Sequence, residues 1–244
     1  MWERVLADVR IVLVEPAGPL NVGAIARVMK NLGLQQLVLV NPQCDPLSAE
    51  ARLMAVHAVD ILETAQQVAT LPEALQGCQR AIATTARVRS LSAVLEYPRT
   101  ALPWLLTPSQ ASALIFGPEY RGLSNEELNY AQRFVSIPSS PSYPSLNLAS
   151  AVAVCCYELS IYVQEGQLSA DTSASTGDYA SLDVLESYYQ HLESLLLKIG
   201  YLYPHTAASR MEKFRQLFNR AELKNAEVAM LRGILTQMEW ALSV

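Results

Sequence analysis

The first 140 residues alternate between short apolar runs and longer amphipathic stretches. The runs are rich in β-branched residues and end at turn-forming residues, which is typical of strands buried on both faces. Five strands are predicted, at residues 9–15, 37–41, 80–86, 112–117 and 133–138. Helices are predicted between them at 21–33, with Asn21 as cap, and at 48–56, 71–77 and 123–131. Strands that alternate with helices predict an α/β fold with a parallel sheet.

The character of the chain changes after a long helix predicted at 147–165. Residues 166–178 are small and polar without an apolar period, which is typical of a flexible linker. Further on, apolar residues recur at three- and four-residue steps, as in a helix packed on another helix: Leu182, Leu185, Tyr189, Leu192, Leu196 and Ile199. Two more helices are predicted at about 207–221 and 225–240. The expected organisation is an α/β domain at 1–165, a linker at 166–178 and a small all-helical C-terminal extension at 179–244.

Composition narrows the function classes. Of 244 residues 51% are hydrophobic, but the longest nearly unbroken apolar stretch, near 151–157, is far shorter than the roughly 18 residues that a membrane span needs. The first residues, MWERVLAD, offer no apolar signal-peptide core, so the expected location is the cytoplasm. Four cysteines (Cys44, Cys78, Cys155 and Cys156) lack metal-ligand spacing and are interpreted as buried thiols. No metal is expected.

Common enzyme signatures are missing from the sequence. It contains no GxGxxG after the first strand, no GxxxxGK[ST] and no GxSxG. The three histidines, His57, His191 and His205, are far apart and lack ligand spacing. Catalysis by a triad or a metal is therefore unsupported.

Polar residues gather instead at turns that follow strands, where open α/β sheets bind ligands. In NVGAIAR, the spacing of Gly23, Arg27 and Lys30 places them on one helical face, which is either a solvated face or a cationic site. Arg87 and Arg89 follow another strand directly, and their guanidinium groups match phosphate oxygens, although arginines in loops are often only solvated.

Two further loops also follow strands. GPEYRGL, at 117–123, has two glycines that permit tight turns. IPSSPSYPSLNLA, at 137–149, is stiffened by three prolines before Ser145 or Asn147 starts the last helix of the domain. Such rigid loops suit a site built from backbone groups.

Together these segments resemble the SPOUT superfamily of RNA methyltransferases, and within it the TrmH-like 2′-O-methyltransferases. The resemblance rests on three ordered motifs: Asn21-x-Gly23-x-x-Ala26-Arg27, Phe116-Gly117-x-Glu119-x-x-Gly122-Leu123 and Ser145-Leu146-Asn147-Leu148-Ala149-x-Ala151. The tail, with MEKFRQLFNRA at 211–221 and MLRGIL at 230–235, is similar to that of TrmJ-type tRNA methyltransferases.

This resemblance implies a deep trefoil knot in the sheet domain, an exception to the rule against knotted chains. It also implies a homodimer in which each active site is completed by the partner, with the helix that follows Asn147 as a candidate interface. The implied cofactor is S-adenosyl-L-methionine, held largely by backbone groups. Its implied contacts are Thr84, Thr85, Ala86, Gly117, Ile137, Pro144, Ser145 and Leu146.

The resemblance further implies that Arg27 is the catalytic arginine. An arginine is a poor base, so we interpret it as a cation that stabilises the developing alkoxide. Asn21 is expected to orient Arg27 or the ribose, and Ser145 to hydrogen-bond the substrate or the arginine. Asn147 is expected to hold its loop or cap the helix, and Glu119 to fix the second loop.

A net charge of −5 fits poorly with RNA binding, so local charge must supply the phosphate contacts. Pro118, Tyr120 and Pro144 stand where relatives often have arginine or serine, which should weaken the phosphate contacts beside the active site unless Arg121 takes over the role. The tail concentrates basic residues beside an apolar stripe, and this pattern is equally compatible with a solvated helix flank. The predicted RNA-binding residues are Arg87, Arg89, Arg121, Arg210, Lys213 and Arg220.

The resulting hypothesis is S-adenosylmethionine-dependent methylation of a ribose 2′-hydroxyl in tRNA, at position 32 of the anticodon loop by analogy with the TrmJ-type group. One alternative is an rRNA methyltransferase of the same superfamily, which the tail disfavours. Another is a catalytically silent knotted RNA-binding protein, which the intact motif residues disfavour. A nucleotide-binding Rossmann domain lacks its glycine fingerprint.

Overall fold

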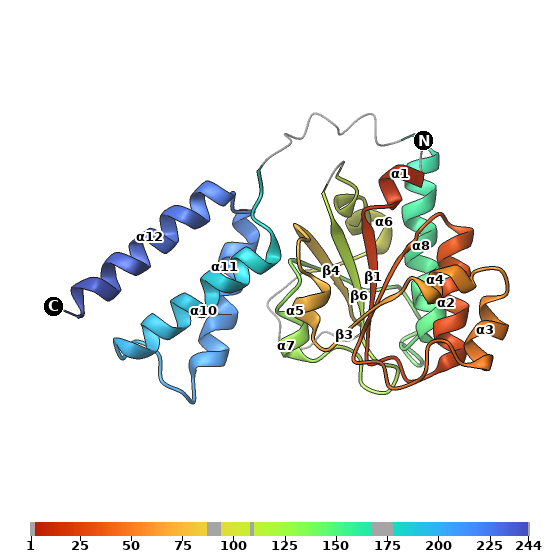
Figure 1. Ribbon diagram of the computed structural model, residues 1–244, viewed down its shortest axis with the longest axis horizontal. Helices are drawn as coiled ribbons and strands as arrows, with labels where there is room; N and C mark the ends of the chain where they lie inside the picture. Colours follow the sequence, from red (N-terminus) through yellow and green to blue (C-terminus); the bar gives the residue numbers. More distant parts are fainter. Residues whose placement is uncertain (1–2, 87–93, 108–109, 167–177, 244) are drawn as a thin grey trace. The chain divides into compact units, whose positions relative to one another are not determined.

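The computed structural model describes residues 3–86, 94–107, 110–166 and 178–243. The chain separates into two compact units, Met1–Ala174 and Ser175–Val244 (Figure 1). The first contains the sheet and the second contains helices, and each is described by itself.

The described residues of the first unit form a seven-stranded sheet in the order β3-β2-β1-β6-β4-β7-β5, in which every pairing is parallel. The predicted α/β fold with a parallel sheet is thus confirmed, and the knot stays a prediction. Two strands, β3 and β5, were not predicted. The strands are β1 (Val9–Val14), β2 (Gln36–Val40), β3 (Gln66–Val68), β4 (Arg80–Thr84), β5 (Leu95–Glu96), β6 (Ser112–Phe116) and β7 (Arg133–Val135).

Both faces of the sheet are covered by helices, which explains why its central strands are apolar without alternation. Figure 1 shows α2 and α8 on one face and α5 and α7 on the other. Ile11 and Leu13 of β1 belong to the core cluster shared with α2 and α8, and all six residues of this strand but Arg10 are buried. The helices are α1 (Glu3–Leu6), α2 (Pro19–Asn31), α3 (Ala49–Ala55), α4 (Val59–Glu63), α5 (Leu71–Ala74), α6 (Pro98–Ala101), the 3₁₀ helix η1 (Leu102–Leu105), α7 (Asn125–Leu128) and α8 (Leu148–Gln164).

The helix expected to begin at Asn21 begins two residues earlier, with Gly18 as its cap and Pro19 in its first turn. Proline is well suited to that position because the first turn lacks partners for its N–H groups. Asn21 is therefore inside the helix, and its side chain is available for other contacts. The helices α5 and α7 are also shorter than the predicted 71–77 and 123–131.

Helix α2 packs closely on α3 at Gly23. A Cβ added at this glycine would lie 2.1 Å from the carbonyl oxygen of Ala51, so only glycine permits the approach. The prediction that Gly23, Arg27 and Lys30 share one polar face is therefore wrong for Gly23, which is buried.

The second unit packs three helices, α10 (Leu182–Lys198), α11 (Ala207–Ala221) and α12 (Asn225–Ala241), around its own core. Leu185, Tyr189 and Leu192 of the predicted apolar stripe are buried in it, whereas Ile199 at the end of the stripe is exposed. The Tyr189 hydroxyl donates a hydrogen bond to Asn219 of α11 at 2.9 Å, which satisfies its polar end inside the core.

Candidate active site

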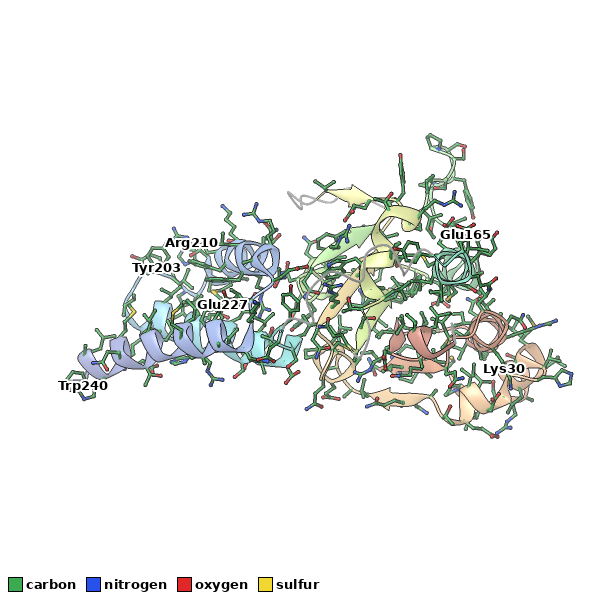
Figure 2. The ribbon with its side chains drawn as sticks, turned by 90° about the horizontal axis from the view of Figure 1, so that it is seen from above. Lys30, Glu165, Tyr203, Arg210, Glu227 and Trp240 are labelled. Carbon is green, nitrogen blue, oxygen red and sulfur yellow. The ribbon has the colours of Figure 1, made fainter. Side chains whose placement is uncertain are left out.

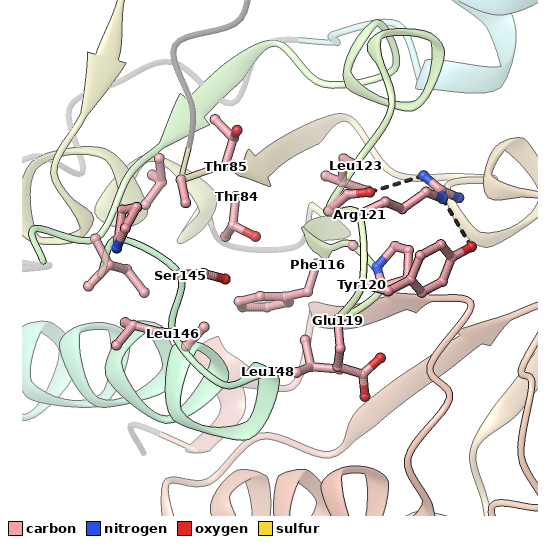
Figure 3. Close-up of a pocket in the computed structure, with 18 residues that line it drawn as sticks. Thr84, Thr85, Phe116, Glu119, Tyr120, Arg121, Leu123, Ser145, Leu146 and Leu148 are labelled. Atoms are coloured by element: carbon pink, nitrogen blue, oxygen red, sulfur yellow. Dashed lines mark hydrogen bonds between the residues drawn. The ribbon is translucent and has the colours of Figure 1, made fainter. Parts of the chain in front are cut away.

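A pocket opens at the carboxyl ends of three adjacent strands of the first unit. The strands β6 and β7 both pair with β4, so their ends lie side by side. The cavity has a volume of about 180 Å³ and is closed on another side by the loop that leads into α8 (Figure 3). Ligands of parallel sheets bind at this edge, because the loops after the strands converge there.

The eight residues predicted as cofactor contacts all line this single pocket. They come from three separate loops: Thr84, Thr85 and Ala86 after β4, Gly117 after β6, and Ile137, Pro144, Ser145 and Leu146 between β7 and α8. In Figure 3 the side chain of Ser145 points toward the middle of the pocket. The structure therefore brings these residues together, and their contact with a cofactor stays a prediction.

Sequence reasoning missed some of the apolar residues of the lining. Phe116, Val135 and Leu148 also line the pocket, and all three are buried. In the sequence they are indistinguishable from core residues. The one available signal was their position in the elements. Phe116 ends β6, Val135 ends β7 and Leu148 starts α8, and residues at such positions can reach a cavity at the edge of the sheet.

The loop after β6 owes its tight course to Gly117. A Cβ at this position would lie 2.3 Å from the backbone nitrogen of Leu123 and 2.5 Å from the carbonyl carbon of Gly122. The Gly122 N–H donates to the Pro118 carbonyl at 2.8 Å and closes the turn, in which Gly122 has a φ of 68°. The motif glycines thus let the loop fold back on itself at the pocket wall.

Three side chains from the three sequence motifs form one hydrogen-bonded chain. Asn147 donates through Nδ2 to Oδ1 of Asn21 at 3.0 Å, and Asn21 donates through Nδ2 to Oε1 of Glu119 at 2.8 Å. Glu119 also accepts from the Ala17 N–H at 3.3 Å. Glu119 lines the pocket, so this chain ties the start of α2 to the pocket wall.

Asn147 has a second task at the start of α8. Its Oδ1 accepts from the N–H groups of Ala149 at 2.9 Å and Ser150 at 3.3 Å, which makes it the N-cap of the helix. The expectations that Asn147 caps this helix and that Glu119 fixes its loop agree with these contacts. Among the described residues Asn21 contacts Glu119 and Asn147 and not Arg27, and its expected role in orienting the ribose stays a prediction.

Arg27 lies on the same helix as Asn21 but outside the pocket lining. Its side chain is exposed, and it forms no hydrogen bond or ion pair with any residue that the structure describes. Lys30 is held differently: its Nζ is 2.8 Å from Oδ1 of Asp60 and donates to the His57 carbonyl at 2.8 Å. Of the two cations on this helix, Arg27 is therefore the one available to a substrate.

Arg121 is engaged by two carboxylates. Its Nη1 and Nη2 donate to Glu127 at 2.7 and 2.8 Å, and Nη2 also donates to Glu15 at 2.8 Å. Hydrogen bonds from Arg121 and Tyr120 hold the pKa of Glu15 below its ordinary value. Burial disfavours the charged form of Glu127, but hydrogen bonds from Arg121 and Ser124 outweigh it and lower its pKa. Two carboxylates therefore already compensate the charge of Arg121. The structure gives no support to the prediction that this residue binds RNA phosphate.

The other predicted RNA-binding residues are placed only in part. Arg210, Lys213 and Arg220 are exposed on α11 of the second unit. Arg87 and Arg89 lie outside the described residues.

The four cysteines differ in their burial. Cys78, Cys155 and Cys156 are buried as expected, whereas Cys44 is half-buried. Burial raises the pKa of Cys155 to about 12, which keeps this thiol protonated. Among the described residues no three His, Cys, Asp or Glu side chains are grouped as a metal site. None of the described helices has the length and apolar character needed to cross a membrane.

Comparison with known proteins agrees with the three motifs. Residues 8–157, which contain the pocket and the chain of Asn21, Glu119 and Asn147, match the model of the SpoU rRNA methylase family. The chain belongs to the SpoU rRNA methylase family. Within this family the second unit gives a further distinction, because residues 183–244 match the model of the C-terminal domain of the tRNA methyltransferase TrmJ.

Individual SpoU family members resemble the chain over almost its whole length. The tRNA (cytidine/uridine/adenosine-2′-O-)-methyltransferase TrmJ of Pseudomonas aeruginosa strain UCBPP-PA14 is 41% identical over 96% of this chain and 95% of its own. The tRNA (cytidine/uridine-2′-O-)-methyltransferase TrmJ of Pectobacterium atrosepticum is 38% identical over 96% of this chain and 98% of its own. The crystal structure of TrmJ from Z. mobilis ZM4 has a TM-score of 0.82 at 30% identity, and the match covers 94% of this chain and 98% of that one.

Proposed function

We propose that this protein transfers a methyl group from S-adenosylmethionine to a ribose 2′-hydroxyl of tRNA. The observation that carries the proposal is the 41% identity to a tRNA 2′-O-methyltransferase over both units of the chain. The match of the second unit to the TrmJ C-terminal domain favours tRNA over the alternative substrate, rRNA. The target position is proposed to be nucleotide 32 of the anticodon loop, which rests on the resemblance to the TrmJ-type group alone.

The chemistry of the pocket lining suits S-adenosylmethionine. The buried apolar side chains of Phe116, Val135 and Leu148 suit an adenine ring, and the loops after β4 and β6 offer backbone groups for its polar edges. Gly117 keeps the wall free of a Cβ at the tightest turn. When bound, the cofactor supplies the electrophilic sulfonium methyl group.

Arg27 and Ser145 are proposed to act on the ribose, and Asn21 is proposed to act as a positioning residue. The task of Arg27 and Ser145 is to hold the 2′-oxygen in line with the methyl group and to stabilise the negative charge that develops on it. Arg27 provides a permanent cation, and the substrate phosphate accepts the proton. Asn21 is hydrogen-bonded to Glu119 and Asn147, and it is proposed to keep the start of α2 in a fixed position relative to the pocket wall.

Because Arg27 is outside the lining of its own pocket, we propose that a second copy of the chain completes each site. Helix α8 presents apolar side chains to solvent along one face: Val154 is 37% exposed, Tyr157 is 51% exposed and Ile161 is partly exposed. Burying such a face between two copies is favourable. Light scattering should give twice the 26.8 kDa of one chain, and a Tyr157→Glu variant should shift toward the monomer.

The proposed activity is tested by incubating the protein with S-adenosylmethionine and unmodified tRNA transcripts. Digestion and mass spectrometry should then reveal ribose-methylated nucleosides at one position. The Arg27→Ala variant serves as control and should bind the cofactor without methylating. Methylation of rRNA fragments in place of tRNA would favour the alternative substrate. Cofactor binding without methylation of either RNA would favour a catalytically silent protein.

A further inference from the structure

The connection between α10 and α11 exposes two tyrosines on either side of an anchored leucine. Tyr201 is 52% exposed and Tyr203 is 54% exposed, whereas Leu202 between them is only 1% exposed. Leu202 belongs to the core of the second unit. Two large aromatic rings that are exposed next to each other form a surface patch, and such patches often mark a binding site.

The backbone of this connection is fixed. The N–H groups of Tyr201 and Leu202 both donate to the Leu196 carbonyl at 3.0 Å. The Tyr203 carbonyl accepts from Thr206 at 2.9 Å and Ala207 at 2.8 Å, which joins the connection to the start of α11. The rings are therefore presented by a preformed surface, and a ligand bound there would not have to order the backbone first.

The rings are accompanied by groups that recognise nucleic acid. The Tyr203 and His205 rings are stacked, with centroids 6.0 Å apart and planes at 24°. The Arg210 guanidinium lies 5.6 Å from the centroid of the Tyr201 ring and donates to the Tyr201 carbonyl at 3.0 Å. Tyr203 and Arg210 are labelled on the second unit in Figure 2. We name Tyr201, Tyr203 and His205 the aromatic platform.

A row of cations continues from the platform along α11. Arg210, Lys213 and Arg220 have a spacing that places them on one side of the helix, together with the exposed Leu217, over a length of about 15 Å. We name the three basic residues the cation row. None of them forms an ion pair with a described carboxylate. Arg215, by contrast, points inward and donates to Glu186 at 2.9 Å.

We propose that the aromatic platform and the cation row together bind an unpaired segment of the tRNA substrate. A base stacks on the exposed rings, and the cation row contacts the adjoining phosphates. Aromatic rings beside cations that pair with no described carboxylate are the combination that binds single-stranded nucleic acids, since every base has a face that can stack. The proposal rests on the proposed function and adds a second contact surface for the same substrate.

An acidic peptide is the competing ligand, but it would use the cations without needing the rings. The two ligands therefore differ in what the tyrosines contribute. A tyrosine-to-phenylalanine change keeps a stacking face, whereas a change to alanine removes it. Binding of an unpaired RNA segment requires the first variant to retain affinity and the second to lose it.

The experiment measures the Kd of the full-length protein for an unmodified tRNA transcript at fixed salt. The double variant Tyr201→Ala/Tyr203→Ala should weaken binding roughly 5- to 10-fold. This is the lower end of the range expected when the stacking of one base is lost. Tyr203→Phe should bind like the wild type. Trp240→Ala is the matched control, because Trp240 is 62% exposed on α12 outside the platform.

The cation row is tested through the salt dependence of the same Kd. Each of Arg210→Ala, Lys213→Ala and Arg220→Ala should reduce the slope of log Kd against log salt by about one. Arg232→Ala is the matched control, since Arg232 is exposed on α12. Photo-cross-linking of tRNA that contains 4-thiouridine should label the peptide spanning residues 199–210.

The outcomes separate this proposal from the proposed function. If the wild type methylates tRNA while the double tyrosine variant keeps the wild-type Kd, the platform is refuted and the function stands. If only the cation variants lose affinity, the surface is electrostatic and stacking is refuted. If the wild type neither binds nor methylates tRNA, the proposed function fails together with this proposal. Circular dichroism of each variant should match the wild type, because the altered side chains are exposed.

Discussion

Asn147 and Asn21 are 126 positions apart in the chain, and a hydrogen bond of 3.0 Å from Nδ2 of Asn147 to Oδ1 of Asn21 joins the starts of α8 and α2. Each asparagine has a second partner: the N–H groups of α8 for Asn147, and Glu119 for Asn21. An amide is needed at both places, because each side chain donates on one side and accepts on the other.

Asn147→Asp should therefore lower methylation while the fold remains stable. The carboxylate keeps an oxygen that caps α8 but loses the donor to Asn21. Asn21 cannot restore this bond by rotating its amide, because the rotation would break its bond to Glu119. We expect a roughly 10- to 100-fold lower kcat, as for a small displacement of reacting groups. Thermal unfolding and single-turnover methylation measure the two effects.

Asn147→Ala is the matched comparison. It removes the cap as well as the donor, so it should also cost about 1 kcal/mol of unfolding free energy. If Asn147→Asp methylates tRNA at the wild-type rate, the bond between the two asparagines has no role in the reaction.

The fold was predicted where strands are buried on both faces. The strands β1, β6 and β4 lie in the middle of the sheet, where continuous apolar runs mark them. The missed strands, β3 and β5, form its two edges and have only three and two residues. Gln66 and Gln67 of β3 are exposed, so no apolar pattern exists there to be recognised.

The sequence indicated which residues form the candidate site, but it did not indicate which of them contact one another. The three motifs name Asn21, Glu119 and Asn147, yet their pairing depends on how α2, α8 and the loop after β6 meet in space. Arg121 shows the same limit. Its partner Glu15 is 106 positions away, and nothing in the sequence indicates that this carboxylate would occupy the guanidinium.

Arg121→Gln should destabilise the protein in a manner that depends on pH. Because the folded state lowers the pKa values of Glu15 and Glu127, their contribution to stability is present above the ordinary glutamate pKa of about 4.3. It is lost as the pH falls through the lowered values. At pH 7 the variant should lose about 1–3 kcal/mol of unfolding free energy, as for hydrogen bonds to charged groups. Urea unfolding from pH 7 down to pH 3 measures the difference, which should shrink toward the acid end.

Arg52→Gln provides the control for this series. The ion pair of Arg52 with Glu63 at 3.0 Å joins side chains that are 43% and 53% exposed, so its removal should have a much smaller effect. A constant difference between Arg121→Gln and the wild type across this pH range would contradict the assigned role of the two glutamates.

Gly117→Ala should strongly weaken cofactor binding, because the added Cβ would lie 2.3 Å from the Leu123 nitrogen and must displace the loop that forms the pocket wall. Isothermal titration calorimetry with S-adenosylmethionine should give a Kd at least roughly 100-fold higher than that of the wild type, because a displaced wall disturbs several cofactor contacts at once. Gly233→Ala on α12 is the control, because no atom lies within 4 Å of the added Cβ. Gly166→Ala is not suitable, because Gly166 has a φ of 70°, which strains any other residue. Cofactor affinity of the wild-type size in Gly117→Ala would exclude this pocket as the binding site.

Arg27→Ala and Gly117→Ala together determine whether a site is built from one chain or two. Each variant alone should be inactive, the first without the cation and the second without the pocket. In a heterodimer, the Arg27→Ala chain keeps an intact pocket, and its partner keeps an intact Arg27. If Arg27 serves the pocket of the other chain, the heterodimer has one complete site and should recover about half of the wild-type activity, the share of one site in a symmetric dimer. Coexpression with two different affinity tags yields this heterodimer, and the methylation assay on tRNA measures it. If Arg27 serves its own pocket, neither site is complete, and the heterodimer would be as inactive as its two parents.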